Sequence, residues 1–198
     1  MMTTLAALLF AATLQVAGPP QLFAPGVIST AALGEAGGTF SPDGRELYFT
    51  VRTPTTTSRP VLMICFSRLI KGRWTTPEMA SFSGMSYDSS PSFSPDGTKL
   101  FFVSTRSAEG KVGNDSDIWV VDREGDHWSA PRNVGAPVNT AANEQSASVA
   151  ADGTLYFSSD REGGKGSFDL YRARFHDGKY EAPETLGEAI NSDAAEWT

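Results

Sequence analysis

The chain has 198 residues, of which 40% are hydrophobic and 20% charged, which fits one globular domain and excludes an intrinsically disordered protein. Its formal net charge of −7, with no cluster of Lys and Arg, argues against nucleic acid and against anionic membrane surfaces as partners. The single cysteine, Cys65, cannot form an intramolecular disulfide, and we interpret it as a buried small hydrophobe rather than a reactive thiol.

An uninterrupted run of apolar and small residues from Leu5 to Leu14 opens the chain. It is shorter than the roughly twenty residues that a membrane-spanning helix needs, and it has the length of a signal-peptide core. We therefore predict that residues 1–18 are a signal peptide, that the mature chain is not inserted in a membrane, and that the protein is periplasmic or secreted. The alternative is an apolar N-terminal helix that stays attached.

Three copies of one strand-and-turn pattern follow. Each has an Asp-Gly turn, an aromatic strand, a polar loop, a second strand, a glycine turn, and an aromatic residue three positions before a proline. The Asp-Gly turns begin at Asp43, Asp96 and Asp152, which lie 96 − 43 = 53 and 152 − 96 = 56 residues apart. Agreement in order and spacing across three copies indicates a repeat protein with units of about fifty residues.

Each copy is predicted to form four strands. Asp-Gly between two apolar runs is a strong hairpin signal, because both central residues of the tight turn favour a positive φ. Strands such as 100–103 and 118–121 are apolar on both faces, so a single sheet would leave one apolar face in water. Stacking the sheets face against face buries both, which predicts an all-β protein: a β-propeller of four-stranded antiparallel blades.

The repeat boundaries define the expected organisation. We expect an orphan strand over residues 22–35, blades over 36–87, 88–143 and 144–193, and the start of another blade over 194–198. Since propellers have about four to eight blades, about three blades cannot close a ring. We therefore expect part of a longer propeller, or a half that self-associates or is completed by another chain.

The turns and the strands after them carry a family resemblance. Phe40–Gly44, Phe93–Gly97 and Leu155–Arg161 resemble the WD-like β-propeller repeat of the TolB type, although the third copy has Ala150 and Ala151 where Ser and Pro are typical. The resemblance implies a six-bladed propeller in the bacterial envelope with a protein partner there. The α/β domain that precedes the propeller in TolB has no counterpart in this chain.

The long loops and the linkers between blades are predicted to share one face, opposite the short Asp-Gly turns, and loops of this kind often carry function. Arg52, Arg106 and Arg161 end the second strand of their repeats. They could form a positive ring for an acidic group, but we favour a framework role in which they pair with a loop carboxylate such as Asp117 or Asp169. The candidate binding residues on this face are Arg52, Arg106, Asp117, Asp160, Arg161 and Asp169.

No catalytic group is predicted. His127 and His176 lie beside turns without a Ser or Cys partner, so we expect neither an enzyme nor a cofactor. The oxygen-rich stretch 114–117 could offer ligands to calcium, but it lacks the glycine and the distant glutamate of a calcium loop, and we interpret it as a polar loop without metal. The recurrent Trp74, Trp128 and Tyr180 are interpreted as packing aromatics rather than a sugar-binding platform.

The sequence leaves three functions open. The first is a non-catalytic binding module of the bacterial envelope that presents its loops to a protein partner. The second is the propeller portion of a larger hydrolase similar to prolyl oligopeptidase, which a Gly-x-Ser-x-Gly motif beyond residue 198 would indicate. The third is a glycan-binding propeller.

Overall fold

The computed structural model describes residues 19–31, 34–53, 61–107 and 115–197. In these ranges the chain forms strands, bridges and turns and no helix. Consequently, no helix of the described part is long and apolar enough to cross a membrane. The predicted signal peptide, residues 1–18, lies outside the described residues, as do residues 54–60 and 108–114 of two of the long loops.

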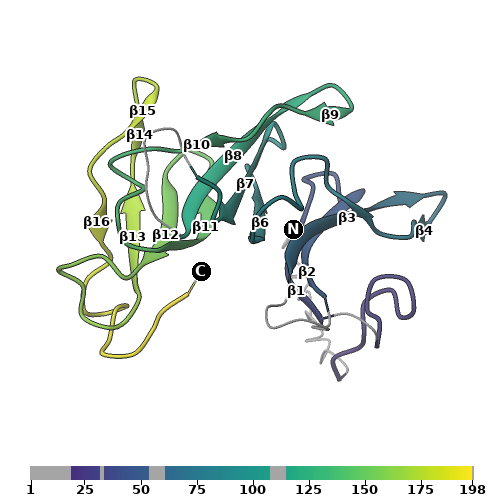
Figure 1. Cartoon of the computed structure of the whole chain (residues 1–198), viewed down its shortest axis with the longest axis horizontal. Helices are drawn as coiled ribbons and strands as arrows, with labels where there is room; N and C mark the ends of the chain where they lie inside the picture. The colour runs from purple at the N-terminus through teal and green to yellow at the C-terminus, as the bar shows by residue number, and fades with distance from the viewer. Residues whose placement is uncertain (1–18, 32–33, 54–60, 108–114, 198) are drawn as a thin grey trace, which may run out of the picture.

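Three antiparallel sheets follow one another along the chain (Figure 1). The first contains β1 (Gly34–Phe40), β2 (Glu46–Arg52), β3 (Leu62–Ile70), β4 (Arg73–Trp74) and β5 (Glu78–Met79). The second contains β6 (Asp88–Phe93), β7 (Lys99–Ser104), β8 (Asp117–Glu124), β9 (His127–Trp128) and β10 (Arg132–Asn133). The third contains β11 (Glu144–Val149), β12 (Leu155–Ser159), β13 (Asp169–Ala173) and β16 (Glu184–Thr185), with the hairpin of β14 (Phe175–His176) and β15 (Lys179–Tyr180) beside it. We call these sheets blades 1, 2 and 3.

The fourth strand of each blade is divided into two short pieces. Pro77, Pro131 and Pro183 lie between the pieces. Proline has no backbone N–H to donate to the neighbouring strand, so it interrupts the ladder and is tolerated at an outer edge. The recurrent aromatic-x-x-Pro pattern therefore encodes an outer strand that pairs, breaks and pairs again.

The Asp-Gly turns form, but only the glycine has a positive φ, not both central residues as expected. The turn of blade 2 shows how it is held. The Ser94 hydroxyl and the Thr98 backbone N–H donate to Asp96 Oδ1 at 2.6 Å and 3.0 Å. Gly97 has a φ of +71°, which an L-residue rarely adopts. In blade 3, Ala150 replaces the serine, so that hydroxyl bond is absent there while the glycine conformation is kept.

Blade 2 lies between the other two blades and is buried on both faces. Leu100 and Phe102 of β7 pack in the cluster shared with blade 1, whereas Phe101 packs in the cluster shared with blade 3. The inner strand β6 contacts β1, β2 and β3, and β11 contacts β6, β7 and β8. This fanned packing of four-stranded sheets, innermost strand against the previous blade, is the arrangement of a β-propeller.

The segment before β1 differs from the expected orphan strand over 22–35. Residues 22–31 form turns, in which the Ile28 N–H donates to the Ala24 carbonyl at 2.9 Å, and β1 begins only at Gly34. Ile28 is buried against the outer face of β2, and Phe23 packs edge-on against Trp74 with ring centroids 5.5 Å apart. The segment therefore covers the apolar outer face of blade 1 instead of adding a strand.

Candidate functional site

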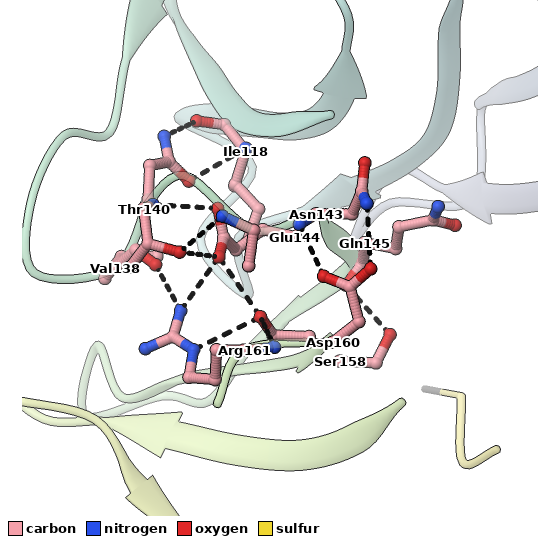
Figure 2. Close-up of polar contacts among 12 residues, drawn as sticks. Ile118, Val138, Thr140, Asn143, Glu144, Gln145, Ser158, Asp160 and Arg161 are labelled. Atoms are coloured by element: carbon pink, nitrogen blue, oxygen red, sulfur yellow. Dashed lines mark hydrogen bonds and ion pairs between the residues drawn. The ribbon is translucent and has the colours of Figure 1, made fainter. Parts of the chain in front are cut away.

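A buried carboxylate anchors the base of the long loop in blade 3 (Figure 2). Glu144, the first residue of β11, is 0% exposed. Arg161, which follows β12, donates from Nη2 to Glu144 Oε1 at 3.1 Å and to the Val138 carbonyl at 2.6 Å, and its Nε donates to Ser159 Oγ at 3.2 Å. The arginine thus joins the inner strand, the second strand and the linker between blades.

Hydrogen bonds from the linker and from β12 complete the environment of Glu144. The Thr140 backbone N–H donates to Oε2 at 3.0 Å, and the hydroxyls of Thr140 and Ser159 donate to Oε1 at 2.7 Å and 3.1 Å. Burial raises the pKa of Glu144, because desolvation disfavours the carboxylate, while the Thr140 bonds and the Arg161 guanidinium oppose the rise. Because Glu144 is fully buried, its carboxylate depends on these donors.

Blade 2 repeats this network with an aspartate. Arg106 Nη2 donates to Asp88 Oδ1 at 2.8 Å and to the Phe82 carbonyl at 3.0 Å, and its Nε donates to Ser104 Oγ at 2.9 Å. Ser83 donates to Asp88 Oδ2 at 2.9 Å, as Thr140 donates to the carboxylate in blade 3. Asp88 is also 0% exposed. The two networks therefore share one design: an inner-strand carboxylate, a strand serine, a linker hydroxyl and an arginine.

The carboxylate partners of the arginines correct the sequence prediction. We expected Arg106 and Arg161 to pair with a loop carboxylate such as Asp117 or Asp169, and they pair instead with Asp88 and Glu144. The reason is the strand register: Asp88 lies opposite Ser104 and Glu144 opposite Ser159, so an arginine two positions after that serine reaches the inner strand.

Arg52 does not share this environment. It is the last residue of β2, and its side chain is exposed. In blade 1 the residue opposite the inner-strand carboxylate Glu35 is Val51, so Thr53, not Arg52, stands two positions later, where blades 2 and 3 have Arg106 and Arg161. The three arginines are therefore not equivalent, and they do not form one ring.

The three candidate aspartates accept bonds from backbone N–H groups and from asparagine side chains. Asp117 Oδ2 accepts a bond from Asn133 Nδ2 at 3.0 Å, and Asp169 Oδ2 accepts from the Lys165 and Gly166 backbone N–H groups at 2.8 Å and 3.0 Å. Asp160 accepts from the backbone and side chain of Asn143 at 2.6 Å and 2.8 Å (Figure 2). The six candidate residues are thus spread over three blades, and the structure does not gather them into one cluster.

Two linker asparagines that the sequence analysis did not select have a matching role. Asn139 Oδ1 accepts from the Ile118 N–H at 3.0 Å, and its Nδ2 donates to the Ile118 carbonyl at 2.8 Å. Asn191 makes the same pair of bonds with Leu170, both at 3.0 Å. Each amide pairs with a residue of the third strand beyond the short outer strand and so fixes the linker to the third strand.

A carboxylate residue recurs four times in the sequence at the start of the repeat. This repetition is the signal that could have revealed the buried networks. Its members Glu35, Asp88, Glu144 and Glu196 are separated by 88 − 35 = 53, 144 − 88 = 56 and 196 − 144 = 52 residues, close to the repeat period. Each accepts a bond from a Ser or Thr hydroxyl four or five residues earlier. In Glu196 the second carboxylate oxygen is buried and makes no hydrogen bond within the described part of the chain.

The described residues offer no group of three His, Cys, Asp or Glu side chains that could hold a metal ion. Of the stretch predicted to be a polar loop, residue 114 lies outside the described ranges, whereas Asp117 is buried at the start of β8. His127 and His176 lie in the β8–β9 and β14–β15 hairpins and are exposed, as expected.

The blades and the repeated loop-base networks define a three-blade sector of a β-propeller. Comparison with solved structures supports this fold: a puromycin-hydrolysing peptidase from Mycobacterium tuberculosis superposes with a TM-score of 0.52 at 20% identity, over 83% of this chain and 25% of that chain. A structure from a study of two prolyl endopeptidases gives 0.51 at 21% identity over 81% and 21% of the two chains, and a gluconolactonase from Xanthomonas campestris gives 0.52 at 16% over 84% and 50%.

The chain therefore spans a fifth to a half of the length of these solved structures. Comparison with family models found no match. Comparison with curated proteins also found none.

Proposed function

We propose that the chain is part of a non-catalytic, TolB-like propeller of the bacterial envelope that presents its loops to a protein partner. The observation that carries this proposal is the repeated network of carboxylate, serine and arginine beneath the loops of blades 2 and 3. The buried, hydrogen-bonded residues at the foot of a loop fix the point where the loop leaves the sheet. The loop is then ordered before a partner binds, which lowers the entropic cost of binding.

Capture of a partner protein from a bacterial envelope extract, with this chain immobilised, tests the proposal. Lys165 is exposed in the loop between β12 and β13, whereas Arg73 is exposed in the β3–β4 hairpin on the opposite, turn face. We expect Lys165→Glu to weaken capture of the partner and the matched Arg73→Glu to leave it unchanged. Capture that responds only to the hairpin substitution, or to neither, would contradict the proposal.

The second candidate function is the propeller portion of a larger hydrolase. Its support is that two of the similar structures are peptidases, which this chain matches over 25% and 21% of their length. Labelling of the protein expressed from its complete open reading frame with a fluorophosphonate probe distinguishes the two functions. A labelled serine outside the blades would favour the hydrolase, whereas no labelling together with loop-dependent capture would favour the binding module. A glycan array distinguishes the glycan-binding alternative.

We also propose that another blade completes the network at Glu196. Its backbone N–H donates to the Phe168 carbonyl at 2.9 Å, as Glu144 donates to Ser116 at 2.8 Å, and Ser192 supplies the linker hydroxyl. The free Glu196 oxygen corresponds to Asp88 Oδ1 in blade 2, the oxygen without the linker hydroxyl, which accepts bonds from the strand serine Ser104 and from Arg106. Sedimentation of the 198-residue chain tests this: we expect association, and a stable, well-dispersed monomer would argue against a missing blade.

A further inference from the structure

A cavity lies on the face opposite the loops, between blades 2 and 3. It has a volume of about 750 Å³ and opens among the Asp-Gly turns and the β14–β15 hairpin. Its apolar wall is formed by Phe101, Val120, Val134, Val149, Phe175 and Tyr180. Small-molecule sites typically have volumes of about 300–1,000 Å³ and are lined mainly by apolar and aromatic side chains with a few polar groups.

The corresponding boundary between blades 1 and 2 is closed at Tyr48 and Trp128, which leaves only a smaller hollow of about 500 Å³ beside the Asp-Gly turns. There Trp128 Nε1 donates to the Tyr48 hydroxyl at 2.9 Å, and Arg123 Nη2 pairs with Glu46 at 2.5 Å. The Arg123 guanidinium also lies 4.4 Å from the centre of a Trp128 ring. An ion pair, a hydrogen bond and a cation stacked on an aromatic ring therefore join blades 1 and 2 across this boundary.

The equivalent residues between blades 2 and 3 cannot form this ion pair or this hydrogen bond. Lys99 stands where blade 1 has Glu46, and Phe101 stands where it has Tyr48, since both pairs occupy the same positions in β7 and β2. Phe175 and Tyr180 pair across their hairpin as Arg123 and Trp128 do. At the boundary between blades 2 and 3, the residues that replace Glu46, Tyr48, Arg123 and Trp128 are therefore Lys99, Phe101, Phe175 and Tyr180. The ion pair and the hydrogen bond are lost together, and the sequence itself encodes the opening.

The rim of the cavity carries surplus positive charge. Lys99 and Arg132 both contact the same carboxylate, Asp122, so two cations share one anion. Lys179 adds a third cation and Asp96 a second carboxylate, so three cations face two carboxylates at this rim. In a chain with a net charge of −7, this local excess favours a ligand with one negative charge.

We propose that this cavity binds a small monoanionic amphiphile, with an aromatic or branched apolar body against the Phe101 wall and an acidic group at Lys99, Arg132 and Lys179. The Tyr180 hydroxyl can add a hydrogen bond to the ligand. Burial raises its pKa to about 12, so the hydroxyl stays protonated at neutral pH. The site is separate from the loop face of the proposed partner, and neither depends on the other.

Fluorescence titration with two related probes tests the site. The sulfonate 8-anilinonaphthalene-1-sulfonate carries one negative charge, and N-phenyl-1-naphthylamine has the same rings without charge. We expect saturable binding of one sulfonate per chain. Lys179→Glu should weaken binding of the sulfonate by about tenfold, a change of about 1.4 kcal/mol, and leave binding of the neutral probe unchanged. Arg73→Glu is the matched control, because Arg73 precedes Trp74 in blade 1 as Lys179 precedes Tyr180 in blade 3.

A filling substitution provides an independent test. Ala151 is exposed and lines the cavity, so Ala151→Trp should abolish binding of both probes without removing a core contact. Binding of both probes that survives Ala151→Trp would overturn the proposal. Equal loss of sulfonate binding in Arg73→Glu and Lys179→Glu would also overturn it, because the probe would then respond to total charge. If circular dichroism shows that Ala151→Trp unfolds the chain, the two charge variants decide the outcome.

Discussion

Removing the guanidinium of Arg161 should destabilise the protein far more than removing an exposed arginine of the same blade. We select Arg161→Met because methionine keeps an unbranched side chain and removes the charged head, which lies 5.0 Å and 4.9 Å from the ring centres of Phe157 and Tyr171. The substitution deletes the bonds to Glu144, Ser159 and the Val138 carbonyl, and it leaves Glu144 buried without its cation.

The expected cost follows from the burial of the pair. Arg161 is 14% exposed at its side chain and Glu144 is 0% exposed, so solvent screens their interaction weakly. Breaking a buried ion pair by removing one partner typically costs about 3–5 kcal/mol. Because Glu144 keeps two bonds from Thr140 and one from Ser159, we expect a loss near the lower end, ~3 kcal/mol in the free energy of unfolding.

Urea unfolding followed by tryptophan fluorescence measures this loss, with Arg172→Met as the control. Arg172 pairs with Glu184 on the surface, with side chains 39% and 49% exposed, and its removal should leave the unfolding midpoint nearly unchanged. The double variant Glu144→Gln/Arg161→Met should be less destabilised than the sum of the single variants, since no buried charge remains. Equal effects of Arg161→Met and Arg172→Met, or strict additivity in the double variant, would refute the reasoning.

Two further predictions concern the turns and a close backbone approach. The bonds from Ser94 and from the Thr98 backbone lower the pKa of Asp96 below its ordinary value of 3.8, so their stabilisation is present above that pH and is lost as the pH falls through the folded-state pKa. Asp96→Asn should therefore be less stable than the wild type at neutral pH, and thermal unfolding at a series of pH values should show the difference closing below 3.8. Gly166→Ala should destabilise blade 3, because the added Cβ would lie 1.8 Å from the Ala194 carbonyl oxygen. Gly34→Ala, whose Cβ would meet its nearest atom at 3.5 Å, should unfold at nearly the wild-type temperature in the same assay.

Local sequence determined the repeated framework of this protein. The Asp96-Gly97 pair dictates its turn through a side-chain bond and a positive φ, both of which need only neighbouring residues. The doubly apolar strand 118–121 requires a sheet on each side, and the structure places Ile118 and Trp119 in opposite clusters. Three blades with an outer strand interrupted at Pro131 and its equivalents follow from such short-range rules.

The tertiary structure alone decided which groups meet. Arg161 lies next to Asp160 in sequence, yet its partner is Glu144, because the register of β11 against β12 places that carboxylate at the end of the second strand. The covering of blade 1 by residues 22–31, which we expected to be a strand, depends on an apolar face assembled from β2 and β3. The cavity likewise arises from residues 76 to 81 positions apart, Phe175 and Tyr180 against Lys99, since 175 − 99 = 76 and 180 − 99 = 81. Turns and strand alternation are set within a few residues, whereas a partner across a sheet is set by register and packing, which no local pattern contains.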